Sequence, residues 1–227
     1  MKCKRCGREY EIWTDEIGLC PECYAEVNFA KFWRGIPKAK QVKLITGELF
    51  ESAKEFYERY GRGRSYIYGD TGAGKTIIAC NILLAKRLIT FAELFIEKGR
   101  FIPNPEVLMG IGRFVSCPQL EFTVKTRLDQ ASGLLEEVAY TMPMLILDDF
   151  GRGSFKKSDY VLDFWFSLLD IRERNHMQTV FTSEKSLDEL RELYGEAIPS
   201  RIYEIVEGNV YLKRGEDRRL KERGNNE

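Results

Sequence analysis

The sequence is poor in histidine, balanced in charge and without long apolar runs, and each shortage narrows the possible functions. Its one histidine, His176, has no partner at ligand or catalytic spacing, so we expect a loop residue before a strand. Lysine plus arginine and aspartate plus glutamate each total 35, so no overall positive field indicates nucleic-acid binding, and contact with single-stranded DNA must be weak or a local patch. No apolar run approaches the roughly 20 residues that cross a bilayer, and the polar start is unlike a secretory signal. We therefore expect no membrane partner and a cytoplasmic location.

The composition is that of a folded chain with room for one full domain and a small appendage. Its 227 residues are 44% hydrophobic and 31% charged, as in globular proteins. Strand patterns alternate with helix patterns from residue 46 onward, which predicts an α/β fold with a parallel sheet flanked by helices.

A glycine-rich segment, GDTGAGKT at 69–76, follows a short apolar run and precedes a helical pattern. This is the context in which such a segment binds phosphate: backbone N–H groups wrap the anion, and the next helix points its positive end at it. Lys75 is expected to bridge the β and γ phosphates, and the Thr76 hydroxyl to ligate Mg²⁺. The predicted nucleotide-binding segment comprises Gly69, Asp70, Thr71, Gly72, Ala73, Gly74, Lys75, Thr76 and Ile77.

Two adjacent aspartates end the apolar run at 144–147. The carboxyl end of such a strand lies beside the phosphate loop in a doubly wound sheet, so we expect Asp148 to face Mg²⁺. Asp149 is then placed to orient and deprotonate the attacking water. Without a phosphate loop upstream, the same pair would be interpreted as a plain turn.

Four of the six cysteines lie in the first 23 residues, as two C-x₂-C pairs separated by thirteen residues. Four thiolates at this spacing, Cys3, Cys6, Cys20 and Cys23, are typical of a closed structural zinc site. Two disulfides or an iron–sulfur centre are the alternatives. So short a segment cannot bury a core, so we expect residues 1–27 to fold around the metal independently of the rest.

Beyond these sites, the chain resembles the DnaC/DnaI-type replicative helicase loaders, a branch of the AAA+ ATPases that includes IstB-type transposition ATPases. The resemblance covers roughly 46–220 and rests on GDTGAGKT, LILDDFG at 145–151, VFTSEKSLDEL at 180–190, YGEAIPSRI at 194–202 and GEDRR at 215–219. It implies an AAA+ P-loop fold preceded by the small four-cysteine zinc module. The expected organisation is a zinc module at 1–27, a linker at 28–45, the ATPase domain at 46–216 and a charged tail at 217–227. Within the linker, Phe29, Phe32 and Trp33 are expected to pack against a neighbouring surface.

The resemblance also implies roles for polar residues outside the two motifs. Thr182 and Ser183 lie where the family senses the γ-phosphate, although Glu184 stands where the family often has asparagine. A carboxylate there would repel phosphate, so either Glu184 points away or sensing falls to Ser183. Arg201 resembles the arginine finger that enters a neighbouring subunit, which implies a homo-oligomer, with Arg191 as a rival. Arg219 resembles the sensor arginine that acts in cis, with Arg218 as the alternate. The segment 88–112 is longer than the corresponding segment usually is in the family. We assign none of its residues to DNA binding.

The function that this resemblance implies is that of a Mg²⁺-dependent ATPase which binds a hexameric replicative helicase and helps to place it on single-stranded DNA. An IstB-type transposition ATPase, a nucleoside kinase with a zinc ribbon, and a switch that binds ATP without turnover remain alternatives. In the loaders that this chain resembles, the N-terminal module binds the helicase. We therefore expect residues 1–27 to bind the helicase.

Overall fold

The computed structural model describes residues 2–9, 18–37, 49–98, 107–127, 130–152 and 158–217. Five parallel strands form one sheet in the order β2-β3-β4-β1-β5. None of the helices in these ranges has the length and apolarity that a bilayer span requires.

The elements alternate between strand and helix along most of the chain. The strands are β1 Ser65–Gly69, β2 Gly112–Ser116, β3 Met144–Asp148, β4 Gln178–Ser183 and β5 Val210–Lys213. The α-helices are α1 Pro21–Val27, α2 Phe29–Phe32, α3 Leu49–Arg59, α4 Lys75–Lys98, α5 Cys117–Thr126, α6 Ala131–Tyr140, α7 Asp159–Arg174, α8 Leu187–Tyr194 and α9 Ala197–Ile205. Short 3₁₀ turns, η2 Gly61–Gly63 and η3 Val107–Ile111, precede β1 and β2.

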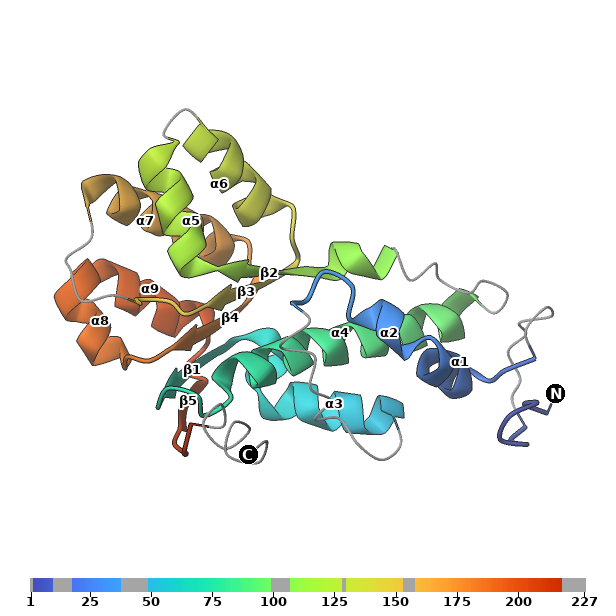
Figure 1. Ribbon diagram of the computed structural model, residues 1–227. Coiled ribbons are helices and arrows are strands. Elements are labelled where there is room, and N and C mark those ends of the chain that lie inside the picture. The colour runs from blue at the N-terminus through green and yellow to red at the C-terminus, as the bar shows by residue number, and fades with distance from the viewer. Residues whose placement is uncertain are drawn as a thin grey trace, which may run out of the picture.

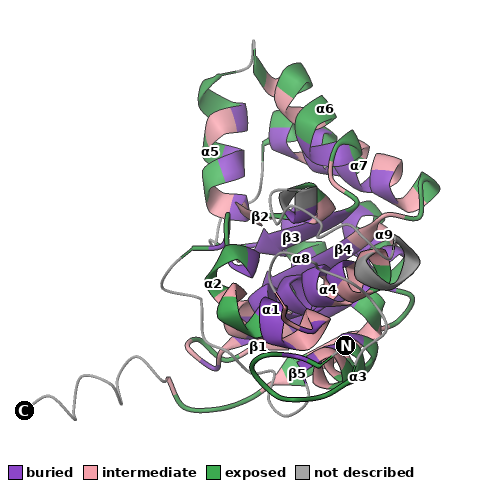
Figure 2. Cartoon of the chain, turned by 90° about the vertical axis from the view of Figure 1, so that its right-hand side faces the viewer, coloured by how far each residue is buried: buried purple, intermediate pink, exposed green. Residues whose placement is uncertain are grey.

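Helices cover both faces of the sheet (Figure 1). The strands alternate their side chains between two cores. Ile146 and Val180 pack with α3 and α4 on one face, whereas Leu145, Leu147 and Phe181 pack with α5 to α9 on the other. The central strands are buried on both sides (Figure 2), as expected for a parallel sheet. The predicted fold class, a parallel sheet flanked by helices, is thereby confirmed.

Local predictions are confirmed where a short-range signal governs the structure. The spacing of Ser186 and Glu189 predicts a capping box, and they form one at the start of α8, with Glu189 N–H donating to Ser186 Oγ at 3.2 Å and Ser186 N–H to Glu189 Oε2 at 2.6 Å. Gly208 and Asn209, within the apolar run at 205–212, predict a hairpin or a bulged last strand, and the structure differs from the hairpin. Gly208 has a φ of 74° and turns the chain into β5, which pairs in parallel with β1.

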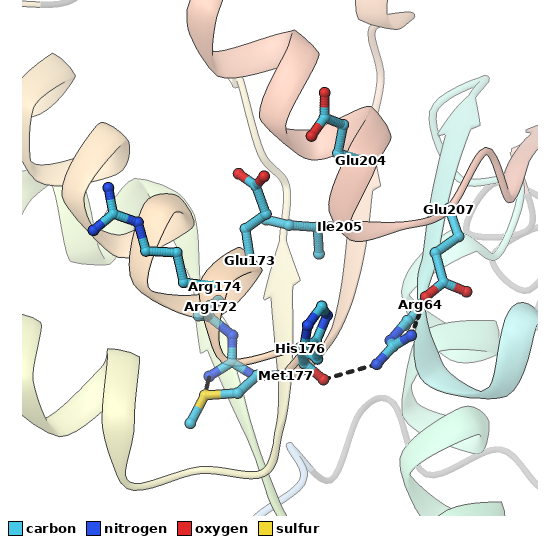
Figure 3. A pocket seen from close by; sticks show the side chains of 9 residues that line it. All are labelled: Arg64, Arg172, Glu173, Arg174, His176, Met177, Glu204, Ile205 and Glu207. Carbon is cyan, nitrogen blue, oxygen red and sulfur yellow. Dashed lines mark hydrogen bonds and ion pairs between the residues drawn. The ribbon is translucent and has the colours of Figure 1, made fainter.

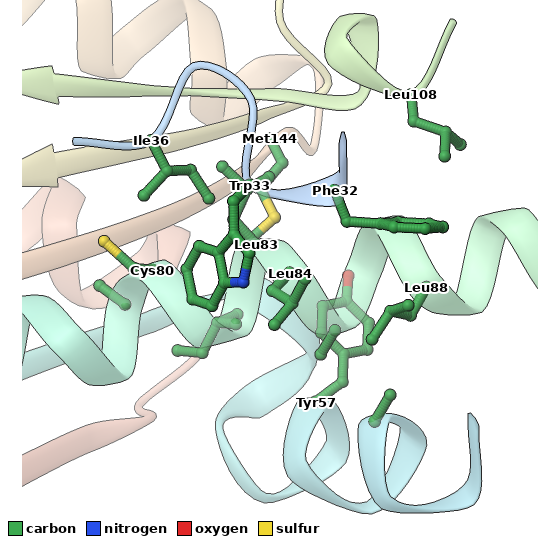
Figure 4. Packing of buried hydrophobic residues seen from close by; sticks show 14 of the residues in the cluster. Phe32, Trp33, Ile36, Tyr57, Cys80, Leu83, Leu84, Leu88, Leu108 and Met144 are labelled. Carbon is green, nitrogen blue, oxygen red and sulfur yellow. The ribbon is translucent and has the colours of Figure 1, made fainter. Parts of the chain in front are cut away.

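The N-terminal segment packs directly on the main domain instead of standing apart from it (Figure 4). Phe32, Trp33 and Ile36, which the sequence assigns to a linker, are at most 5% exposed and contact the cluster around α4. Tyr24 of α1 stacks on Phe91 of α4, with ring centroids 5.6 Å apart. The expected independence of residues 1–27 is therefore not what the packing shows, because these aromatic side chains share a core with α3 and α4.

Two polar contacts fix this docking. The carboxylate of Glu22 accepts a hydrogen bond from Leu49 N–H at 2.7 Å and so caps the first turn of α3. Arg87 of α4 is 2% exposed and donates to the carbonyls of Phe32, Arg34 and Gly112 at 2.8, 2.7 and 3.0 Å. One buried guanidinium thus joins the N-terminal segment, α4 and β2, and burial lowers its pKa to about 10.

Candidate functional site

The candidate nucleotide site lies at the edge of the sheet where the parallel strands end. Tyr68 is paired with Ser183, Leu147 with Phe181, and Gly69 with Lys213, so the carboxyl ends of β1, β3, β4 and β5 meet there. Ligands of open α/β sheets bind at this edge, beyond the strand ends. The predicted phosphate loop and both aspartates come from these ends.

The glycine-rich loop connects β1 to α4, and Lys75 and Thr76 occupy the first turn of the helix. Its geometry requires glycine where neighbouring backbone comes close. At Gly69, with φ at 126°, an added Cβ would lie 2.2 Å from the carbonyl oxygen of Lys213. Glycine at this position therefore lets the loop pass close to the end of β5.

Lys75 is 6% exposed, and its ammonium donates to the carbonyls of Gly69 and Asp70, both at 2.7 Å. Burial lowers the pKa of Lys75 from its usual value, and nearby carboxylates, led by Glu184, oppose that shift. The ammonium is therefore held across the mouth of the loop by backbone oxygens.

Thr182 joins the ends of β3 and β4. Its hydroxyl donates to Asp148 Oδ1 at 2.7 Å and accepts from Asp149 N–H at 3.0 Å. Asp148 is 6% exposed and Thr182 is fully buried. The carboxylate of Asp148 at the end of β3 is consequently held by Thr182 at the end of β4. The sequence alone does not show that these two strand ends lie side by side.

Asp149 has the left-handed φ of 57°, which is uncommon for a residue other than glycine and is concentrated at functional sites. Its Oδ2 accepts from the Arg152 guanidinium at 2.8 Å. The chain then turns through Gly151, where a Cβ would meet Leu190 at 2.3 Å. Sequence reasoning missed Arg152, although its spacing of three residues from Asp149 was a usable signal.

The structure places Ser183 and Glu184 differently, and Glu184 does not point away from the loop. The Ser183 hydroxyl is fully buried, donates to the Phe150 carbonyl at 2.8 Å and accepts from Lys185 N–H at 3.0 Å. Glu184 is exposed, and its Oε1 accepts from the Thr71 hydroxyl of the phosphate loop at 2.8 Å. It is thus Glu184 whose side chain reaches the loop.

The segment after β5 also contacts the phosphate loop. Asp70 N–H donates to the Lys213 carbonyl and Asp70 Oδ2 accepts from Gly215 N–H, both at 3.1 Å. Asp217 approaches Gly72 so closely that a Cβ there would lie 1.9 Å from its carboxylate. No local sequence pattern signals this contact, because it depends on β5 pairing with β1. The predicted sensor arginine Arg219 and its alternate Arg218 lie outside the described residues.

Arg201, the predicted arginine finger, is held by side chains of its own chain. It pairs with Glu173 at 2.7 Å and Asp170 at 3.0 Å, and its guanidinium lies over the Phe166 ring, 4.4 Å from the centroid. These three partners belong to α7, so the network fastens α9 to α7. The rival Arg191 pairs with Asp188 and Glu196 around α8.

The four N-terminal cysteines converge as the spacing predicts. Their sulfur atoms all lie within 4.8 Å of one another, and Cys6 Sγ is 3.8 Å from Cys20 Sγ. Sulfur atoms bound to a tetrahedral zinc at about 2.3 Å would lie roughly 3.8 Å from each other. All six cysteines fall in described ranges and are free thiols, so the alternative of two disulfides is not what this structure contains. Cys20 N–H donates to Cys3 Sγ at 3.3 Å, which favours a thiolate there.

A separate cavity of about 340 Å³ opens at the opposite edge of the sheet, where β1, β4 and β5 begin (Figure 3). Arg64 donates to the His176 carbonyl at 2.8 Å and pairs with Glu207. Arg172 is fully buried and bonds to carbonyls at the end of α6 and to Thr179. Since Arg64 and Arg172 bind other segments of the same chain, we interpret this cavity as a gap between packed elements that these contacts hold together.

The parallel sheet and the glycine-rich loop that runs from β1 into α4 together define an AAA+-like α/β fold, and an N-terminal cluster of four cysteines that could hold a metal ion is added to it. Comparison with solved structures found a similarity to DnaI, at 21% identity over 83% of this chain and 92% of that chain, with a TM-score of 0.49. The DnaC helicase loader matches at 21% identity over 81% and 99%, with a TM-score of 0.47.

Domain III of the replication initiation protein DnaA from Thermotoga maritima matches at 15% identity over 80% of this chain and 68% of that chain, with a TM-score of 0.51. Identities this low relate the folds alone. No protein-family model matches the sequence, and a search of curated proteins gave no match.

Proposed function

We propose that this chain binds and hydrolyses Mg²⁺·ATP at the carboxyl edge of its sheet. The observation that supports this most directly is the meeting of Lys75, Asp148 and Thr182 at one edge, with the phosphate loop leading into α4. Several carboxylates face one buried lysine there, so a polyphosphate needs a divalent cation to offset their charge.

In this proposal each residue has a distinct task. The loop backbone from Gly69 to Thr76 and the N-terminus of α4 bind the phosphates, and Lys75 leaves its carbonyl partners to contact the terminal ones. Asp148 and the Thr76 hydroxyl hold Mg²⁺, which when bound shares the phosphate charge. Asp149 orients the attacking water and accepts its proton.

We further propose that the ATPase cycle serves a helicase loader that recognises a hexameric replicative helicase and acts on single-stranded DNA. The support is the set of motifs quoted above, in particular LILDDFG with its required Gly151 and the SRI segment of α9. The four cysteines bind zinc, which when present supplies a structural cross-link, and the surface of this module is the proposed helicase contact.

Two titrations test these proposals separately. Fluorescent ATP with Mg²⁺ should bind the intact chain and a Lys54→Ala control on the exposed side of α3, but not Lys75→Ala. Purified replicative helicase should bind the intact chain and lose affinity for the Cys20→Ser/Cys23→Ser variant. Nucleotide binding without any helicase affinity would reject the loader role and leave the IstB-type alternative, which a matching transposase tests in the same format.

A further inference from the structure

Glu184 occupies a central place at the candidate nucleotide site. It is the first residue after β4, and β4 lies between β3, which ends in Asp148, and β1, which leads into the phosphate loop. Its side chain is exposed at this edge, and Oε1 accepts the Thr71 hydroxyl hydrogen at 2.8 Å. The carboxylate thus lies between the proposed Mg²⁺ ligand and the loop.

The backbone on both sides of Glu184 is fixed, which limits where its carboxylate can go. Thr182 and Ser183 are fully buried, and their hydroxyls bond to Asp148 and to the Phe150 carbonyl. The Lys185 carbonyl accepts from the Tyr66 hydroxyl at 2.7 Å, and Lys185 N–H donates to Ser183 Oγ. The backbone of Glu184 is therefore held beside the loop, and its carboxylate is positioned there by the contact with Thr71.

Glu184 lies beside the loop whose lysine contacts the terminal phosphates. Its Oε1 bonds to Thr71, four residues before Lys75, and β4 pairs with β1, which leads into the loop. The lysine of this motif contacts the β and γ phosphates. A carboxylate bonded to Thr71 of this loop therefore lies near the position of the γ-phosphate.

We infer that Glu184 determines the preference of this site between nucleoside diphosphates and triphosphates, by placing a fixed carboxylate beside the γ-phosphate position. The inference rests on the proposed nucleotide function. A diphosphate leaves the Thr71 contact with Glu184 in place, whereas a triphosphate brings a like charge against the carboxylate. The diphosphate complex is favoured as a result, and hydrolysis relieves the repulsion.

The test is Glu184→Gln, because the amide oxygen still accepts from Thr71 while the charge is removed. Affinities are measured by calorimetry, with Mg²⁺, for ADP and for the non-hydrolysable β,γ-imido analogue of ATP. We expect affinity for the analogue to rise about tenfold, roughly 1.4 kcal/mol, which lies between the interaction of two unit charges about 4 Å apart in water and near a protein surface, and affinity for ADP to stay within about twofold. Glu192→Gln on α8 removes one exposed charge away from the loop and should leave the ratio unchanged.

Salt provides a second measurement. Raising the ionic strength from roughly 0.05 to 0.5 M shortens the screening length severalfold, so the difference between wild type and Glu184→Gln for the analogue should shrink. An equal change in both affinities, or no change in either, overturns the inference. Failure of the wild-type chain to bind both nucleotides rejects the proposed function itself, and so is distinguishable.

Discussion

Thr182 shows how much one hydroxyl contributes at the residue scale. It donates to Asp148 and accepts from Asp149 N–H, so it sets the positions of both members of the aspartate pair. Asp148 is buried by this contact, whereas Asp149 turns outward with a left-handed backbone and pairs with Arg152. Neighbours in sequence therefore have different surroundings, which supports the different roles proposed for them.

The two proposed roles at this edge predict different defects. Lys75→Ala should weaken ATP binding about 10- to 100-fold, since it removes hydrogen bonds from a charged donor to phosphate. Asp149→Asn should bind ATP normally but hydrolyse it about 10²- to 10⁴-fold more slowly, the usual contribution of a general base. Equilibrium titration and steady-state phosphate release measure the two effects. Wild-type turnover in both variants would show that the site is assigned to the wrong residues.

At the scale of elements, α7 and α9 are joined by a charged cluster on their surface. Arg201 of α9 bonds to Asp170 and Glu173 of α7 and covers Phe166, and its side chain remains 25% exposed. Partly exposed ion pairs contribute little stability, typically about 1 kcal/mol or less. The cluster is thus compatible with an arginine that can also be presented to a neighbouring subunit.

The arginine-finger role predicts complementation between two inactive variants. Arg201→Ala and Lys75→Ala subunits should each be slow, since a trans arginine adds roughly 10³- to 10⁵-fold in related NTPases. Mixed assemblies should recover part of the ATPase rate, because some interfaces then carry both an intact loop and an intact finger. Arg191→Ala serves as the matched control. Co-assembly without rescue would leave Arg201 with only its contact to α7.

The helix α4 carries the connection between the phosphate loop and the N-terminal segment. Lys75 begins the helix and Arg87 lies in its middle. Phe91, which stacks on Tyr24, lies 16 residues after Lys75, about 24 Å along the helix axis. Arg87 satisfies three carbonyls from two other segments. Its loss should therefore be felt in the packing of the whole N-terminal segment.

Arg87→Met tests that connection while keeping most of the side-chain volume. Buried carbonyls left without donors cost about 1 to 3 kcal/mol each when they cannot reach water, so we expect the free energy of unfolding to fall by at least about 2 kcal/mol. Urea unfolding measures it. Lys86→Met, which loses only a cation–π contact to Tyr57, should cost less than about 1 kcal/mol. Equal effects would show that Arg87 does not hold the segment.

Across the whole molecule, the cysteine module and the main domain form one packed body. The hydrophobic cluster that contains Ile78 and Leu83 of α4 also contains Tyr24, Phe32 and Trp33. Removing residues 1–27 would therefore expose part of this cluster. The sequence predicts that one module recognises the helicase and the other binds ATP. The Cys20→Ser/Cys23→Ser variant tests this prediction better than a truncation, because it leaves the shared core covered.

Metal removal is predicted to lower the stability of the entire chain. Because α1 begins within the second cysteine pair and packs on α3 and α4, loss of zinc should shift a single cooperative thermal transition downward. Calorimetry with and without a chelator measures this, and added zinc should restore the midpoint. A separate low-temperature transition, with the main one unchanged, would instead indicate two independent modules.

The sequence by itself determined the features that depend on short-range patterns. These include the glycine-rich loop between strand and helix, the capping box at Ser186, the C-x₂-C pairs and the alternation that specifies a parallel sheet. Each arises from residues a few positions apart, whose chemistry or backbone geometry is the same in most folds. The roles proposed for Lys75, Asp148 and Asp149 follow from the same local patterns and await the experiments above.

Only the tertiary structure decided which side chains reach across from distant segments. Glu184 meets Thr71 because β4 lies beside β1, and Lys213 meets Asp70 because β5 takes the other side of β1. The packing of Phe32 and Trp33 against a neighbouring surface is predicted from the sequence, but only the tertiary structure shows that this surface is the cluster around α4. Strand order and docking depend on the sum of many weak contacts between distant residues, and no local pattern records that sum.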